Sequence, residues 1–339
     1  MALLLPSLIA LLATAFSAAV SIRALKSVRS RGRTIVVLVA AEAETRRAVR
    51  GAQGRMLLAL VLGLVAAIAV ANLWIGAFGI PLTIAPGVGA AIALVSIVAS
   101  PLPRRQAPSG IRRADLTARE ATTFGPRWAF VLPVVAAVLL VALVVATGAT
   151  AELDSRGLAR VLYTVVQPGQ TNAGSPYPGW YYGAPILIVT GILVGCTFLA
   201  LRRVAAAPRN SAIDFWAMDD AVRSALTRFV MFISSGTIVL YLGAVALQSG
   251  SILRSGAQWS HIKQSVLDAH LRAGDMSFVT RAKDVVHGVV QPQYTTGAIE
   301  TVVGLLLIGV ALTLAILAIA SIRIRWSVSA PSEPEKVDA

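Results

Sequence analysis

The chain has 339 residues, of which 56% are hydrophobic and only 14% are charged, and its mean hydropathy is +0.75. Soluble domains carry roughly 45–50% apolar and about 25% charged residues, so this composition excludes a soluble protein. The formal net charge of +14 would also suit a nucleic-acid-binding protein. However, many basic residues follow directly after apolar stretches, where they orient a membrane protein and attract anionic lipid. We therefore expect the lipid bilayer as a partner and no nucleic acid.

Seven apolar stretches predict seven transmembrane helices, each near the ~20 residues that cross the hydrocarbon of a bilayer. In chain order they are 2–22, 56–78, 82–100, 128–149, 184–201, 229–248 and 299–322. Helices satisfy their backbone polar groups internally, as a membrane requires. The predicted fold is an all-α, polytopic integral membrane bundle with one transmembrane domain over 1–322.

The Lys and Arg residues are divided unevenly between the segments that separate these stretches. Of the 30, 23 lie in 23–55, 101–127, 202–228 and the segment from 323 onward. Cytoplasmic loops retain basic residues, so the sequence predicts the N-terminus outside and the C-terminus inside (N-out/C-in). We expect a multi-pass protein of a bacterial plasma membrane. Its last residues, 323–339, are expected to form a disordered cytoplasmic tail.

Two segments on the predicted outer side, 150–183 and 249–298, are too long for structureless connections. We expect them to pack together as a small outer cap. Both contain the sequence Val-Val-Gln-Pro, at 165–168 and 289–292. Whether this shared sequence marks a true internal repeat stays open.

Glycine and proline crowd the short connection between the second and third predicted helices. Proline in a helix interior removes a hydrogen bond and clashes with the preceding turn. We therefore expect Pro86 to shorten or break the start of the helix at 82–100.

An amphipathic helix is predicted to lead into the sixth transmembrane helix. Ser211 and Asp214 form a helix start signal, with Asp214 as the N-cap. Apolar residues then recur at spacings of three and four. This stripe is a candidate docking surface for a cytoplasmic ATPase or another protein partner, and it comprises Phe215, Met218, Val222 and Leu226.

An aromatic cluster precedes the fifth predicted helix, with two prolines and two glycines that restrict its backbone. One interpretation is an interfacial belt, because Trp and Tyr favour the headgroup region. The other is an outer aromatic lip that contacts lipid or a ligand. The residues concerned are Tyr177, Trp180, Tyr181 and Tyr182.

Ionisable residues are missing from the central part of every predicted helix, which argues against coupling to protons or sodium. Glu300 comes nearest and is expected to be an interfacial charge at the outer end of the last helix. His261, His270 and His287 share the segment 249–298 with three Asp residues, but their spacing matches no metal motif. No phosphate-binding loop or nucleophile motif is present either. We expect no catalytic, cofactor or metal site.

Two short stretches carry a family resemblance. The first is 113–119 (RADLTAR) and the second is 177–185 (YPGWYYGAP). Both resemble stretches of uncharacterised polytopic membrane proteins of actinobacteria. The resemblance implies a membrane protein and brings no activity or functional residue.

Three functions remain in view. The favoured one is a non-enzymatic, permease-like component of a transport system that works with a separate ATPase. A membrane sensor or regulatory partner is the alternative, in which the two long segments receive a signal. A lipid-handling membrane enzyme with its site at the aromatic lip is the second alternative.

Overall fold

The computed structural model describes residues 22, 35–38, 42–73, 79–100, 124, 127–167, 170–207, 215–262, 285–324 and 326–329. The chain forms two compact units, each considered separately below. The cap unit contains the described residues of 141–184 and 242–306. The bundle unit contains those of 15–140, 185–241 and 307–324, together with 326–329.

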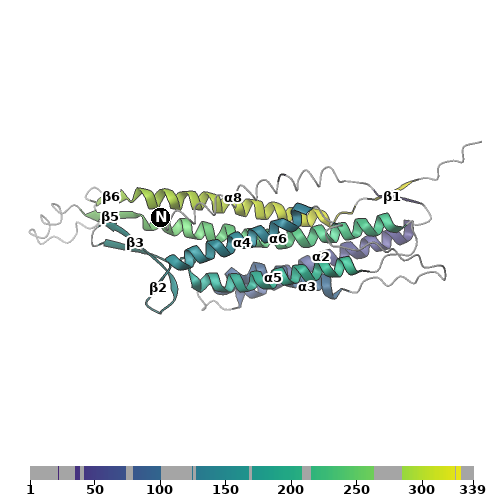
Figure 1. Ribbon diagram of the computed structural model, residues 1–339, viewed down its shortest axis with the longest axis horizontal. Helices are drawn as coiled ribbons and strands as arrows, with labels where there is room; N and C mark the ends of the chain where they lie inside the picture. Colours follow the sequence, from purple (N-terminus) through teal and green to yellow (C-terminus); the bar gives the residue numbers. More distant parts are fainter. Residues whose placement is uncertain are drawn as a thin grey trace, which may run out of the picture. The chain divides into compact units, whose positions relative to one another are not determined.

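Six long helices make up most of the described chain (Figure 1). They are α2 (Glu42–Asn72), α3 (Ile80–Ala99), α4 (Arg127–Thr150), α5 (Trp180–Ala206), α6 (Trp216–Gly256) and α8 (Gln291–Ser321). All six are long and apolar enough to cross a membrane, which confirms the prediction of a helical membrane bundle. The first predicted helix, 2–22, lies outside the described residues apart from Ile22. Seven helices and the N-out/C-in orientation therefore stay predictions.

Several helices extend beyond their predicted ends. The sixth was expected at 229–248, but α6 runs without a break over 41 residues, so its length is about 60 Å. The predicted amphipathic segment is thus the first part of the same helix. The last helix was expected from 299 and begins at Gln291. Hydropathy detects the part of a helix that suits hydrocarbon, whereas the helix itself continues through polar flanks that have adequate helix propensity.

The connection from α2 to α3 ends at Gly79, whose φ of 87° is in the left-handed region that favours glycine. The expectation that Pro86 shortens or breaks α3 is wrong, because the helix continues through it from Ile80. A side chain from α6 supports this point. The Gly87 N–H donates to the Tyr241 hydroxyl (2.7 Å), which donates to the Ile84 carbonyl (3.0 Å). A neighbouring helix thus satisfies backbone groups beside the proline.

The helices α2 and α3 approach each other through glycine. A Cβ atom at Gly63 would lie 2.7 Å from the Gly89 carbonyl oxygen, and one at Gly89 would lie 2.5 Å from the Gly63 oxygen. Small residues let the backbones of membrane helices come into contact. The resulting van der Waals packing drives helix association in lipid, where the hydrophobic effect does not act between helices.

The bundle unit also contains a buried arginine, Arg223 of α6, with 3% of its surface exposed. Its Nε donates to Asp219 (2.8 Å), and its terminal nitrogens donate to the carbonyls of Val204, Ala205 and Ala207 at 3.1, 3.2 and 2.8 Å. The last carbonyls of a helix have no partner within the helix and carry partial negative charge. Arg223 therefore caps the C-terminal end of α5.

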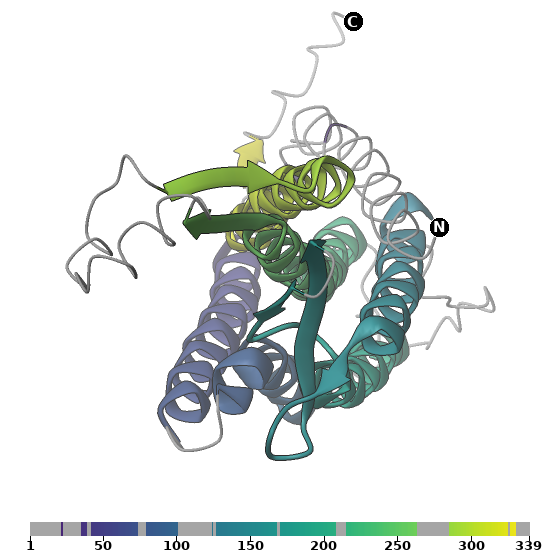
Figure 2. The same cartoon turned by 90° about the vertical axis from the view of Figure 1, so that its left-hand side faces the viewer.

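Short strands modify the all-α expectation. They are β1 (Ile35–Leu38), β2 (Glu152–Leu153), β3 (Ala159–Gln167), β4 (Gln170–Gly174), β5 (Gln258–Ile262), β6 (Val285–Val289) and β7 (Trp326–Ser329). In the cap unit, β2, β3 and β4 form one antiparallel sheet and β5 pairs antiparallel with β6, its neighbour in Figure 2. In the bundle unit, β1 and β7 pair in parallel. The expectation of a disordered tail over 323–339 is thus corrected for 326–329.

The two long segments contact each other, as the cap prediction requires. The Asn172 amide donates to the carbonyls of Gly256 (3.2 Å) and Gln258 (2.7 Å). Leu162 and Tyr177 from the first segment pack against Leu253 from the second. The contact involves the last turns of α6 because that helix extends to Gly256.

The apolar side chains of the first long segment differ in their burial. Val161 is buried, but Val165 is 62% exposed. The two Val-Val-Gln-Pro copies also differ in structure: Gln167 ends a strand, whereas Gln291 begins α8. The shared sequence does not produce a shared fold.

Within the cap unit, α6 and α8 touch backbone to backbone. A Cβ atom at Gly250 would lie 2.6 Å from the Gly297 oxygen, and one at Gly304 would lie 2.5 Å from the Leu247 nitrogen. Glycine at these positions therefore sets the close contact of the two helices.

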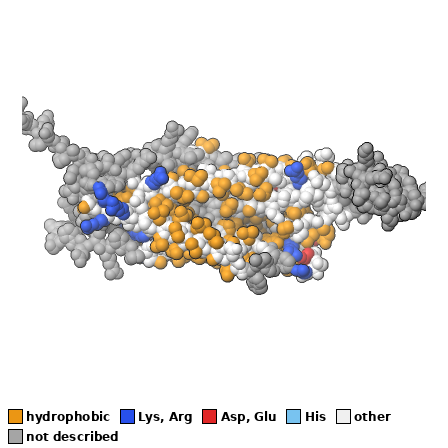
Figure 3. Space-filling model, turned by 180° about the vertical axis from the view of Figure 1, so that it is seen from behind, with side chains coloured by type: hydrophobic (Ala, Val, Ile, Leu, Met, Phe, Trp, Pro, Cys, Tyr) orange, Lys and Arg blue, Asp and Glu red, His pale blue; other side chains and the backbone are white. Residues whose placement is uncertain are grey.

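Much of the exposed helix surface is apolar. Large hydrophobic side chains of α2, α4, α5 and α8 are exposed, and Figure 3 shows such side chains over one face of the molecule. Water-soluble proteins rarely expose an apolar surface of this extent, so lipid is its natural contact. By contrast, α6 is the most buried of the six helices.

Candidate functional site

The four residues of the predicted aromatic lip do not share one environment. Tyr177 and Tyr182 are buried, with 1% and 8% exposure, whereas Trp180 is 43% exposed. The Tyr181 ring meets that of Tyr182 edge to face at 4.9 Å and lies 5.9 Å from the guanidinium carbon of Arg160. The cluster is therefore partly a packed core of the cap unit, and only Trp180 offers a large exposed aromatic surface.

The turn before β3 is held by Asp154. Its carboxylate accepts the N–H groups of Arg156 (2.8 Å) and Leu158 (2.9 Å) and the Nε of Arg160 (2.7 Å). The Leu158 hydrogen bond contributes most to holding the pKa of Asp154 below its ordinary value, and the bonds from Arg160 and Arg156 add to it. Three donors on one carboxylate fix the turn before β3.

Tyr177 is the centre of a buried polar cluster. Its hydroxyl is hydrogen-bonded to the Thr150 hydroxyl at 2.9 Å. Burial raises the pKa of the Tyr177 phenol, the nearby hydroxyls of Thr150 and Ser249 lower it, and the charge of Glu300 raises it. A residue predicted for a lipid-facing lip thus joins α4, α6 and α8 within the cap unit.

Glu300, which was expected to be an interfacial charge, belongs to this cluster. The residue is fully buried, with 0% exposure. Because α8 begins at Gln291, Glu300 lies nine residues inside the helix, or about 14 Å along its axis. An ionisable residue buried within a membrane helix is a functional candidate by default.

Ser249 adds another oxygen to the cluster. It is also 0% exposed, and within the described chain its hydroxyl makes no hydrogen bond of normal geometry. It nevertheless lies close enough to affect Tyr177. No sequence pattern pointed to Ser249 or Thr150.

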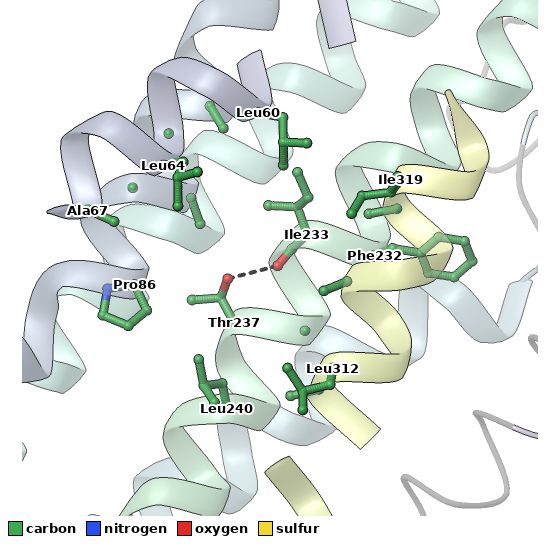
Figure 4. A pocket seen from close by; sticks show the side chains of 18 residues that line it. Leu60, Leu64, Ala67, Pro86, Phe232, Ile233, Thr237, Leu240, Leu312 and Ile319 are labelled. Atoms are coloured by element: carbon green, nitrogen blue, oxygen red, sulfur yellow. Dashed lines mark hydrogen bonds between the residues drawn. The ribbon is translucent and has the colours of Figure 1, made fainter. Parts of the chain in front are cut away.

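A second candidate site is an apolar groove of about 250 Å³ in the bundle unit. Figure 4 shows side chains of α2, α3, α6 and α8 around it. Leu64, Leu312 and Ile319 in its lining are more than half exposed, so the groove opens to the surroundings of the helices. Thr237 has the single hydroxyl of the lining, and it donates to the Ile233 carbonyl at 2.9 Å.

The predicted docking stripe is partly covered by the chain itself. Met218 and Leu226 are buried, with 2% and 6% exposure, whereas Phe215 and Val222 are half-buried. Phe215 and Val222 therefore offer part of their side chains to a partner. Docking through this stripe stays a prediction. The helix start signal at Ser211 and Asp214 lies outside the described residues.

Most of the histidine and aspartate residues considered for metal binding lie outside the described residues. His261 and His287 have described backbone in β5 and β6, but His270 and the three Asp residues fall in 263–284. Among the residues that the structure describes, no group of three potential metal ligands occurs.

Comparison of the chain with known protein families, with curated proteins and with solved structures finds no match. The class of the protein therefore follows from its own fold. Six apolar helices make it a multi-pass integral membrane protein whose helices contact the lipid bilayer. Its described part holds the buried polar cluster around Tyr177 and an apolar groove.

Proposed function

We propose that the chain is a non-enzymatic, permease-like component of a transport system in a bacterial plasma membrane, working with a separate ATPase. The observation that carries this proposal is the groove between α2, α3, α6 and α8 (Figure 4). A permease needs a hollow between its membrane-crossing helices where a cargo is held. The groove supports such a role, because four helices contribute to it and it is open on one side.

The groove favours an apolar cargo, such as the acyl chain of a lipid. Of the 18 side chains that line it, Thr237 alone carries a polar group, and that hydroxyl already donates to Ile233. A polar cargo would lose its hydration in this groove without gaining hydrogen bonds. Transfer of a polar group from water to hydrocarbon without a new hydrogen bond costs roughly 4–8 kcal/mol. The ATPase would dock at the first turns of α6, where Phe215 and Val222 are half-buried.

The test is to purify the tagged chain from native membranes in mild detergent and to measure ATP hydrolysis in the complex. We expect an ATP-hydrolysing protein to co-purify and its activity to rise several-fold when lipid from the same membranes is added. Ala315→Trp should fill the groove from α8, where Ala315 is an exposed lining residue. The variant should keep the partner and lose the stimulation by lipid.

Ile316→Trp is the matched control. Ile316 is the next residue of α8, is 65% exposed and does not line the groove. Stimulation that is lost equally in both variants would show that the groove is not the cargo site. Co-purification of a protein kinase or a DNA-binding regulator in place of an ATPase would instead favour the sensor, and the permease proposal would be wrong.

A further inference from the structure

The groove of the bundle unit is elongated along its helices. Its lining runs from Leu60 to Ala67 on α2 and from Ala311 to Ile319 on α8, which is about 10–12 Å along each helix axis. Its volume of about 250 Å³ is below the roughly 300–1,000 Å³ of pockets that enclose most of a drug-sized molecule. The groove therefore has room for one apolar chain lying along the helices, with the rest of its owner outside (Figure 4).

Basic residues gather beyond one end of this groove. The pairing of β1 with β7 joins the segment before α2 to the segment after α8, so the N-terminal end of α2 and the C-terminal end of α8 lie at the same end of the bundle unit. This basic end has Arg50 on α2 and Arg323 just after α8, both of them exposed. By contrast, the sequence has no charged residue over 56–103 or over 301–322.

One face of α2 connects the groove to the basic end. Leu64, Leu57 and Arg50 are spaced seven residues apart, so they share a face of the helix. Leu64 lines the groove and is 61% exposed, and Leu57 is 50% exposed. The two acidic residues of α2, at 42 and 44, are farther from the groove than any of its arginines. The surface of α2 thus changes along this face from apolar at the groove to cationic at Arg50.

The end of α8 shows the same order of side chains. Ile319 lines the groove and is 51% exposed, and Arg323 follows four residues later, about 6 Å along the helix axis. The Arg323 N–H donates to the Ala320 carbonyl (3.2 Å), so the chain still turns as a helix at this point. Residues four apart share a helix face, which puts Arg323 on the side of Ile319. Two helices that border the groove therefore lead from apolar surface to an exposed guanidinium group.

We propose that the groove binds one acyl chain of an anionic phospholipid, whose headgroup lies at the basic end, where Arg50 and Arg323 attract it. The acyl chain has no hydration to lose in the apolar lining. The guanidinium group of arginine binds phosphate through paired hydrogen bonds. A neutral lipid has the same chain but gains much less from the two arginines. The inference rests on the proposed permease function, because it names the class of cargo.

The test uses the purified full-length chain in vesicles of phosphatidylcholine that contain a lipid probe with a photoreactive diazirine in its acyl chain. One probe has the anionic phosphatidylglycerol headgroup, and the other has the zwitterionic phosphatidylcholine headgroup. Mass spectrometry after illumination measures the labelling of the groove residues. We expect the anionic probe to label them far more strongly. Ala315→Trp should abolish this labelling by filling the groove, whereas Ile316→Trp should keep it.

The two arginines should carry the preference for the anionic probe. Arg50→Gln and Arg323→Gln should each lower it about five-fold, the factor that corresponds to about 1 kcal/mol for a basic residue near an anionic surface. Arg203→Gln is the matched control and should keep it. Arg203 is exposed in the last turn of α5, which contributes no residue to the groove. All three residues are exposed, so the melting temperatures of these variants should stay at the wild-type value.

Equal labelling of the groove by the two probes in the wild type would overturn the proposal. An equal loss of preference in Arg50→Gln, Arg323→Gln and Arg203→Gln would overturn it too, because the preference would then reflect general surface charge. A groove labelled by neither probe has another occupant, which also contradicts the proposal. The permease function is judged separately by the co-purifying ATPase. A groove that prefers the anionic probe in a chain without an ATPase partner would leave the binding site correct and the permease function wrong.

Discussion

Arg223 in the bundle unit and Glu300 in the cap unit are both ionisable residues buried on long helices, with 3% and 0% exposure. Their surroundings differ in kind. Arg223 donates to one carboxylate and three carbonyl groups, and its guanidinium carbon lies 5.4 Å from the centre of the Phe124 ring. Glu300 lies at the glycine contact of α6 and α8, and its charge acts on the Tyr177 phenol. A buried charge that is held by an opposite charge and by carbonyl acceptors is a structural element, and removing it is costly.

The largest effect is expected for Arg223→Met, which removes the C-terminal cap of α5 and leaves Asp219 without its partner. Breaking a buried ion pair costs about 3–5 kcal/mol, so the melting temperature in detergent should fall strongly. Arg203→Met is the control, since Arg203 is exposed in the last turn of the same helix. If the two variants have the same melting temperature, the contacts of Arg223 are not structural and the comparison with Glu300 fails.

The next effect in size concerns the contact that encloses Glu300. Gly304→Ala would place a Cβ atom 2.5 Å from the Leu247 nitrogen, which forces α6 and α8 apart. Overpacking of this kind costs about 1–3 kcal/mol. It should also admit a water-soluble carbodiimide to Glu300, measured by mass spectrometry.

Gly309→Ala is the matched variant, because a Cβ atom at Gly309 meets nothing within 4 Å. Alanine favours a helix over glycine by up to about 1 kcal/mol, so this variant should melt no lower than the wild type. Equal destabilisation by both substitutions would mean that the close contact at Gly304 is not specific.

A smaller effect is expected for Glu300→Gln at neutral pH. The amide keeps the shape of the side chain and can still form hydrogen bonds, so the change in stability should be about 1 kcal/mol or less, the net value of a single hydrogen bond. The check is to compare the melting temperatures of Glu300→Gln, Arg223→Met and the wild type. A loss as large as that of Arg223→Met would make Glu300 a structural charge as well.

The smallest effect is expected for Asp154, which forms an ion pair near the surface of the cap unit. Hydrogen bonds lower the pKa of Asp154, so the folded turn gains stability above the ordinary Asp pKa of about 3.9 and loses it as the pH falls through the lower folded value. Asp154→Asn should abolish this acid response. The measurement is the protection factor of the Leu158 amide, which donates to Asp154, that is, its exchange rate relative to that of an unfolded chain at the same pH. A protection factor that does not fall with acid in the wild type would contradict the assignment.

Hydropathy predicted the six described helices because each has a long apolar segment, but it misplaced the ends that carry polar residues. Glu300 shows the consequence. With the last helix expected from 299, Glu300 was assigned to the interface, although α8 continues back to Gln291. The periodicity of small and polar residues contains the correct signal: Gly297, Glu300 and Gly304 share one face, and membrane helices pack through such faces.

The partners of the buried residues could not be predicted in the same way. Thr150, Tyr177 and Ser249 come from three separate parts of the chain, and nothing local to any of them indicates the other two. The aromatic cluster was predicted as a surface because Tyr and Trp favour membrane interfaces. Burial of Tyr177 depends on its hydrogen bond to Thr150 and on its packing with Leu253, both of which are long-range contacts.

The hydroxyl of Tyr241 has a consequence for how the protein is made. It accepts a hydrogen bond from the Gly87 N–H and donates one to the Ile84 carbonyl, on either side of Pro86. Yet Tyr241 comes 154 residues later in the chain than Gly87. Synthesis proceeds from the N-terminus, so α3 enters the membrane well before α6 leaves the ribosome. Until then, the bilayer offers no group to replace the tyrosine. The hairpin of α2 and α3 therefore reaches its final form only after translation has passed Tyr241, and the last step of its folding belongs to a helix not yet present when it is inserted.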